Sequence, residues 1–245
     1  MKLFVCIDDT DNYDSIGTGE LLENMMGEAA IKGLAKSGFT VRYQLYIHED
    51  IPYTSHNSSM CCTAEATDLE AFTEFCENYL EENSAEGSDP GLCVLPDDEN
   101  LDYSSLIAFG KRAQNEVLTK KDAYDAAESF PGEIHLSEHG GTGGGIIGAL
   151  AGAALRAGKE EGRIKGKLQP LLNKPGWSLS EFASVYGVAR FIDEDGNEIT
   201  ENLSIRFVHP TKLLYSQGQV TAVIVNENGS YMPKPKIKKN KEKSQ

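Results

Sequence analysis

Three aspartates lie close together near the start of the chain, in the sequence Ile7-Asp8-Asp9-Thr10-Asp11. They directly follow a short apolar run, so we expect them at the end of a buried strand. Like charges raise one another's pKa where water is excluded, and a hard divalent cation relieves that conflict. Asp8, Asp9 and Asp11 are therefore predicted to hold Mg²⁺, which commonly takes one or two carboxylates together with phosphate oxygens. The alternative is a solvated acidic turn that caps the next helix.

A glycine-rich stretch from Glu138 to Gly148 is the second candidate for chemistry, between a predicted strand and a predicted helix. Glycines let the backbone approach a phosphate closely, and the helix N-terminus behind them offers unpaired N–H groups. The stretch is therefore predicted to bind the phosphates of ATP, through Gly141, Thr142, Gly143, Gly144 and Gly145. A flexible turn with a close helix–sheet contact at Gly148 is the alternative. No Gly-Lys-Ser/Thr follows, which excludes a Walker P-loop, and a Rossmann site is disfavoured.

His56 and Asn57 form a third, weaker candidate at the entry to a predicted strand. Polar side chains at such a position can contact a nucleotide or a phosphate. A lone histidine is equally an ordinary loop side chain, so the position alone does not decide between the two interpretations.

The net charge of −15 argues against nucleic acid and anionic membranes as partners of the body of the protein. The segment from Lys234 to Lys243 carries six Lys and one Glu, so the rest of the chain sums to −20. Residues 231–245 are predicted to be a disordered, lysine-rich tail, either solubilising or in weak contact with RNA or an acidic partner.

The five cysteines show neither a disulfide framework nor zinc-ligand spacing, which favours reduced thiols in a cytoplasmic protein. No signal peptide is recognisable at the start. The longest apolar stretch, from Ile146 to Leu155, is too short to span a bilayer, so no membrane association is expected.

Hydrophobic periodicity predicts a mixed α/β fold, with strands and helices alternating up to residue 157 and a β-rich part after Lys174-Pro175-Gly176. The turn signal Asp195-Gly196 predicts a hairpin. The expected strands are 3–7, 41–47, 58–66, 92–95 and 133–136, with paired strands 185–192 and 198–207 and a further pair 212–215 and 219–225. The expected helices run from Thr18 to a stop at Gly38, from Asp68 to about Glu82, within residues 97–130, and from Ile146 to Ala157.

The order of these motifs resembles a known family, the archaeal 2-agmatinylcytidine synthetases that modify an isoleucine tRNA. The resemblance rests on Ile7-Asp8-Asp9-Thr10-Asp11, an Ile51-Pro52 step before His56-Asn57, Gly141-Thr142-Gly143-Gly144-Gly145-Ile146-Ile147-Gly148-Ala149-Leu150, and His209-Pro210 before Leu214-Tyr215. It extends from about Leu3 to Val225.

The resemblance implies a kinase-like α/β domain joined to a ferredoxin-like domain, which we place within residues 1–230 and roughly 56–131 respectively. In that family ATP activates a cytidine by phosphorylation, and agmatine then displaces the phosphate. By match, Asp8, Asp9 and Asp11 sit with metal and nucleotide. Thr18 corresponds by spacing to the family's autophosphorylated threonine, although the Met-Cys that precedes it there is replaced by Ile16-Gly17. Thr18 is therefore expected to be a transient phosphate acceptor or a helix cap.

The family's OB-fold and zinc ribbon, which hold tRNA, are not recognisable here, so direct tRNA binding is not expected. The leading hypothesis is Mg-ATP-dependent phosphoryl transfer, or ATP-driven ligation of an amine, on a small-molecule or protein acceptor. One alternative is a nucleotide-binding regulatory protein that transfers nothing. Another is the catalytic subunit of a split tRNA-modifying enzyme.

Overall fold

The computed structural model describes residues 1–236 apart from Ser55 and Leu172. The chain divides into two compact units, Met1–Gly162 and Arg163–Gln245. Residues 1–230, predicted as one unit, are therefore divided near residue 162.

An antiparallel sheet forms the centre of the first unit, in the order β6-β5-β1-β4-β3. With the helices between them, β1, β3, β4 and β5 make a βαββαβ chain, and their spatial order β5-β1-β4-β3 is the ferredoxin-like split βαβ. This arrangement occupies residues 2–96 and so begins well before the predicted range of roughly 56–131. The strands are β1 (Lys2–Asp8), β2 (Ala35–Ser37), which pairs with β4, β3 (Val41–Gln44), β4 (Ser58–Ala66), β5 (Gly91–Pro96) and β6 (His135–Glu138).

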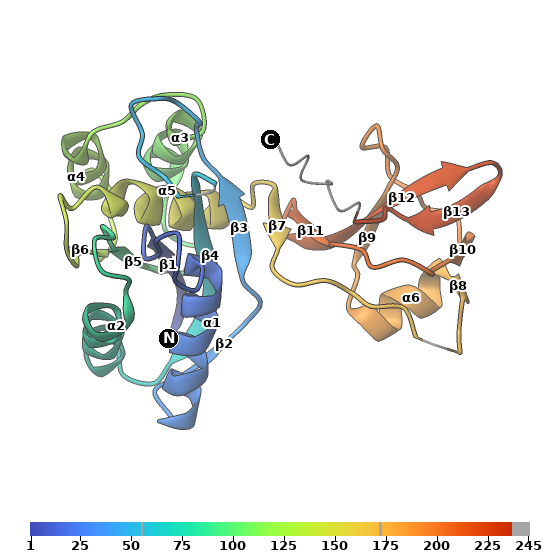
Figure 1. Ribbon diagram of the computed structural model, residues 1–245, viewed down its shortest axis with the longest axis horizontal. Coiled ribbons are helices and arrows are strands. Elements are labelled where there is room, and N and C mark those ends of the chain that lie inside the picture. Colours follow the sequence, from blue (N-terminus) through green and yellow to red (C-terminus); the bar gives the residue numbers. More distant parts are fainter. Residues whose placement is uncertain (55, 172, 237–245) are drawn as a thin grey trace. The chain divides into compact units, whose positions relative to one another are not determined.

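Two helices, α1 (Thr18–Ile31) and α2 (Leu69–Asn83), cover one face of this sheet (Figure 1). Alternation along β1 turns Leu3, Val5 and Ile7 toward them, and all three side chains are buried. The predicted helix from Thr18 was too long. It ends at Ile31, because Gly33 adopts a left-handed φ of +72° that terminates the helix, and β2 follows.

The opposite face of the sheet packs against α5 (Gly145–Ala157), which matches the helix predicted there. Small residues allow a close approach: a Cβ on Gly152 would press into Cys6 and Ser59. Cys6 lies in register with Cys61 on one neighbouring strand and Cys93 on the other. These thiols are fully buried, and burial raises the pKa of Cys6 and Cys93. None of the helices in residues 1–236, as far as they are described, is long and apolar enough to cross a bilayer.

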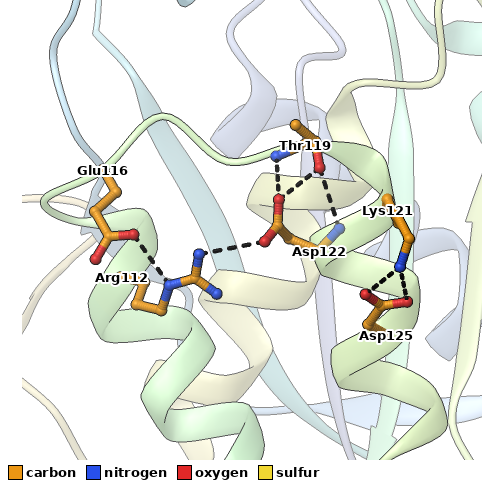
Figure 2. Close-up of polar contacts among 6 residues, drawn as sticks. All are labelled: Arg112, Glu116, Thr119, Lys121, Asp122 and Asp125. Atoms are coloured by element: carbon orange, nitrogen blue, oxygen red, sulfur yellow. Dashed lines mark hydrogen bonds and ion pairs between the residues drawn. The ribbon is translucent and has the colours of Figure 1, made fainter.

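Helices α3 (Ser104–Ala113) and α4 (Lys120–Glu128) pack beside α5. The turn between them is held by the polar network drawn in Figure 2. Arg112 donates from Nε to Glu116 at 3.0 Å and from a terminal nitrogen to Asp122 at 3.2 Å, and Asp122 forms a capping box with Thr119. This network fixes residues 116–118, which matter for the site described below.

The second unit is a small β structure with one helix, α6 (Leu179–Tyr186). Its long strand, β12 (Gln219–Glu227), pairs with β11, β13 and β9. An aromatic cluster of Trp177, Phe182 and Phe207 forms the centre of its core. The remaining strands are β8 (Gly176–Ser178), β9 (Arg190–Ile192), β10 (Ser204–Arg206), β11 (Leu214–Ser216) and β13 (Ser230–Pro233), while β7 (Gly162–Ile164) spans the boundary between the units.

Of three expectations for this unit, the structure confirms one strand pair and differs from the predicted hairpin and the predicted tail. The predicted hairpin of 185–192 with 198–207 is reduced to the bridge between Ile192 and Glu198, because Val185 belongs to α6 and β10 pairs instead with β13 and β8. The predicted pair 212–215 and 219–225 is confirmed as β11 and β12. The predicted tail is occupied in its first residues by β13, and Lys236 donates its N–H to the Pro210 carbonyl. Residues 237–245 lie outside the described chain.

Candidate functional site

The acidic turn and the glycine loop meet in one cleft of the first unit, which encloses about 200 Å³. The sequence-predicted residues that line this cleft come from segments far apart along the chain. They are Asp8, Asp9, Asp11, Thr18, His56, Asn57, Thr142, Gly144 and Gly145. Gly141 and Gly143 belong to the same loop. One cleft therefore brings together the residues predicted to hold the metal and most of those predicted to hold the phosphates.

Antiparallel pairing and three glycines bring these segments together. Asp8, the last residue of β1, lies opposite Gly91, the first residue of β5. A Cβ on Gly91 would overlap the backbone of Gly145, so the strand start and the start of α5 touch directly. One turn into α5, a Cβ on Gly148 would overlap the Asp8 carboxylate. Small residues at these positions are thus required for the helix to lie over the acidic turn.

The carboxylates of the acidic turn are in electrostatic conflict. Burial, followed by the nearby charge of Asp9, raises the pKa of Asp8 to about 8. Burial, followed by the charges of Asp89 and Asp11, raises the pKa of Asp9 to about 6. Asp9 also adopts a left-handed backbone conformation with φ of +52°, which is uncommon for a residue other than glycine and is found often at functional sites.

Asp11 is held by two threonine hydroxyls. Thr18 Oγ1 donates to Asp11 Oδ1 at 2.8 Å, and Thr54 Oγ1 donates to Asp11 Oδ2 at 3.1 Å. The N-cap residue of α1 is Gly17, and the Thr18 hydroxyl is directed to Asp11 rather than to the helix N-terminus. This geometry does not support the helix-cap interpretation of Thr18. It places a nucleophilic hydroxyl against a carboxylate that can accept its proton.

Asp89 was not predicted from the sequence, although its side chain lines the cleft. Its carboxylate accepts from Thr142 Oγ1 at 2.5 Å, from Gly143 N at 2.6 Å and from Gly144 N at 3.0 Å. Asp89 precedes β5, and the antiparallel register of β5 with β1 brings it next to Asp9. That pairing is the signal that would have pointed to it, and it depends on the tertiary fold.

The other side of the glycine loop is supported by Glu138. Its carboxylate accepts from Lys120 Nζ at 2.9 Å and from Tyr124 Oη at 2.5 Å, and these contacts lower the pKa of Glu138. A Cβ on Gly143 would overlap this carboxylate, and the residue has a φ of +79°. The loop therefore runs between two carboxylates, Asp89 and Glu138, and only glycine fits at position 143.

Asn57 has a structural role in the cleft wall. Its Nδ2 donates to the Tyr46 carbonyl at 2.6 Å, and its own carbonyl accepts from Leu45 N, which ties the end of β3 to the start of β4. His56 lines the cleft as an exposed side chain. The apolar wall of the cleft was not predicted from the sequence. It is formed by Leu45, Ile51, Pro52, Tyr53, Ala113, Val117 and Leu118.

The carboxylate-rich floor fits a divalent cation in its donor chemistry, because a cation would relieve the conflict that raises the pKa of Asp8 and Asp9. Within the described residues, no three His, Cys, Asp or Glu side chains already surround a common point as a metal-ligand set. Mg²⁺ does not need such a set, since it usually binds one or two carboxylates and completes its shell with phosphate oxygens and water.

Comparisons with known proteins agree with this architecture. No protein-family model matches the chain, and no curated protein matches it. Among solved structures, apo TiaS, an isoleucine-tRNA agmatidine synthetase, is 23% identical with a TM-score of 0.54 over 63% of this chain and 35% of that chain. A complex of TiaS with its tRNA and ATP is 28% identical with a TM-score of 0.54, over 63% and 36%. A tRNA fluorescent labeling enzyme is 28% identical with a TM-score of 0.53, over 63% and 36%. This chain thus matches little more than a third of each of those proteins, and over 63% of its own length it has the TiaS-type α/β fold.

Proposed function

We propose that the cleft binds ATP as its magnesium complex and transfers a phosphoryl group to an acceptor. The observation that carries the proposal is the meeting of the acidic turn, the glycine loop and the Thr18 hydroxyl in one cleft. The fold, shared with a TiaS structure that contains ATP, supports it. The apolar wall next to the acidic floor supports it further, because a nucleotide has an apolar base and charged phosphates.

Asp8 and Asp9 would hold Mg²⁺, which when bound neutralises charge that develops on the transferring group. The start of α5 would direct its N–H groups and dipole toward the phosphates. Val117 and Leu118 would pack against the adenine ring, and the Arg112 network of Figure 2 would keep that wall in place. These roles need only positioning and charge stabilisation, which dominate phosphoryl transfer.

Thr18 is the first acceptor in this proposal. Its Oγ1 would form a bond to the γ-phosphorus while the bond from that phosphorus to the ADP oxygen breaks. The hydroxyl proton would pass to Asp11 Oδ1, which already accepts it in a hydrogen bond of 2.8 Å. The phosphoryl group would then pass to a second acceptor, a small molecule or a protein, because the net charge of −15 disfavours direct binding of tRNA.

The test is an assay with γ-labelled ATP that follows released phosphate and labelled protein. The variants are Asp8→Asn, Thr18→Ala and Thr18→Ser, with exposed Ser15→Ala as the control for a lost hydroxyl nearby. Wild type and Ser15→Ala should turn over ATP, and Asp8→Asn should lose at least about a hundredfold, the scale typical of removing a transition-state charge contact. Label should disappear from Thr18→Ala and persist in Thr18→Ser.

The outcomes separate the hypotheses. ATP binding without turnover or labelling would favour the nucleotide-binding regulatory protein. Turnover that appears only with added tRNA, or only with a partner chain, would favour the split tRNA-modifying enzyme. Failure to bind ATP with or without Mg²⁺ would refute the proposal.

A further inference from the structure

The N–H groups of the glycine loop are already engaged by an anion, and that anion is the Asp89 carboxylate. Asp89 Oδ1 accepts from Gly143 N at 2.6 Å, and Asp89 Oδ2 accepts from Gly144 N at 3.0 Å and from Thr142 Oγ1 at 2.5 Å. Two backbone donors and one hydroxyl converging on a charged oxygen pair are the recognition elements that a phosphate would also use. A phosphate and the Asp89 carboxylate therefore cannot both hold these three donors.

The backbone of Asp89 cannot retreat to make room. Its N–H donates to the Asp9 carbonyl at 3.0 Å, and its carbonyl lies so close to Gly145 that a Cβ there would overlap it. Only rotation of the side chain can release the loop. Asp8, Asp9 and Asp11 line the same cleft, so turning the carboxylate toward them brings negative charges together and is unfavourable unless a cation is present.

We propose that Asp89 is a specificity-determining residue that admits phosphate to the glycine loop only together with a cation. The inference rests on the proposed function and deepens it. Without a cation, Asp89 holds the loop donors and the acidic floor repels a bare polyphosphate. With a divalent cation, the side chain turns toward the metal, and the phosphate takes the donors of residues 142–144.

The variant Asp89→Asn tests this directly. Asparagine keeps the size of the side chain but loses the charge, and its amide nitrogen is a donor, so the side chain can no longer accept from both Gly143 N and Gly144 N in the present geometry. The probe is inorganic tripolyphosphate in the presence of a chelator, measured by isothermal titration calorimetry. Asp89→Asn should bind this metal-free probe at least about tenfold more tightly than wild type, which corresponds to about 1.4 kcal/mol.

A matched control separates competition from general electrostatics. Asp50 lines the same cleft and is exposed, and Asp50→Asn removes the same charge without touching the loop. Asp50→Asn should change the affinity for metal-free tripolyphosphate by less than about threefold, since exposed charges are well screened. Equal effects of Asp89→Asn and Asp50→Asn would overturn the proposal.

A measurement on wild type does not depend on how the variant folds. The amide resonances of Gly143 and Gly144 should shift in ¹⁵N spectra when tripolyphosphate and Mg²⁺ are added together, and should stay in place when tripolyphosphate is added alone. Binding with Mg²⁺ that leaves both resonances unchanged would show that Asp89 keeps its donors and would refute the competition. If neither tripolyphosphate nor ATP binds under any condition, the proposed function fails as well. If ATP binds normally but the Asp89 tests give the contrary results, the proposed function stands and only the role of Asp89 is refuted.

Discussion

Asp8→Asn should stabilise the metal-free protein while it destroys the site. The native protein keeps Asp8 protonated up to a pKa of about 8, against 3.8 for an unperturbed carboxyl. The unfolded chain releases that proton from about pH 4 upward, so the native state binds more protons across this window. The contribution of Asp8 to stability therefore falls as pH rises from about 4 to about 8. Asparagine has no proton to lose and escapes this penalty.

The size of the effect follows from the pKa difference. Near pH 7 the carboxyl is held protonated about 3 pH units above its ordinary pKa, and each unit is worth about 1.36 kcal/mol, which gives roughly 4 kcal/mol. Asp8 is only half-buried by solvent accessibility, so screening reduces this value. We expect Asp8→Asn to gain about 1–3 kcal/mol near pH 7, and less than about 0.5 kcal/mol near pH 4.

Native-state hydrogen exchange of the β1 amides, in chelator and at several pH values, measures this gain in the unit that contains Asp8. Exposed Asp14→Asn is the control for losing one negative charge and should be neutral within about 0.5 kcal/mol. Mg²⁺ should stabilise wild type and have little effect on Asp8→Asn. An Asp8→Asn protein that is less stable than wild type at pH 7, or that keeps the wild-type pH dependence, would refute the electrostatic account of the acidic turn.

Three further substitutions probe other parts of the fold. Gly148→Ala should displace the Asp8 carboxylate and abolish ATP binding in calorimetry, and ATP binding retained by this variant would contradict the packing argument. The control Gly27→Ala lies in open space on α1. It should stabilise the protein by about 0.5–1 kcal/mol of helix propensity and so raise the thermal midpoint. Phe182→Ala should lower the unfolding free energy of the second unit by about 3–5 kcal/mol, measured by urea unfolding with Trp177 fluorescence as the probe. A loss below about 1 kcal/mol would mean that the aromatic cluster is not the core of this unit. Ser178→Ala should cost the same unit about 1 kcal/mol by removing the capping box of α6, with an unchanged urea midpoint as the contrary result.

Local patterns predicted much of the first unit. The strand from Ser58 to Ala66 and the helix after Asp68 were located within a residue, because alternation and an N-cap act over short distances. The second unit was predicted less well, since β10 selects partners by tertiary packing rather than by the nearby turn at Asp195-Gly196. The boundary at residue 162 precedes the change to β-rich sequence after Gly176, so that change does not locate it.

The candidate site shows the same division between local and non-local information. Carboxylates at Asp8, Asp9 and Asp11 and the glycines of residues 141–145 are conspicuous in sequence, and the cleft does bring both groups together. Asp89 and the apolar wall are not conspicuous, because each is an ordinary residue that becomes special through pairing of β5 with β1 or packing of residues 116–118. The two motifs can be recognised in the sequence, whereas Asp89, which lies between them, is recognised only from the three-dimensional structure.

The row of thiols beneath α5 can be used to measure how often this helix separates from the sheet. Cys6, Cys61 and Cys93 lie side by side on three adjacent strands and are fully buried. A thiol reagent can reach them only after α5 lifts from the sheet, and the same movement takes the glycine loop away from the acidic turn. The rate of thiol labelling therefore reports the frequency with which the cleft opens. A ligand that joins its two sides should slow that rate in proportion to its occupancy, without any assay of chemistry.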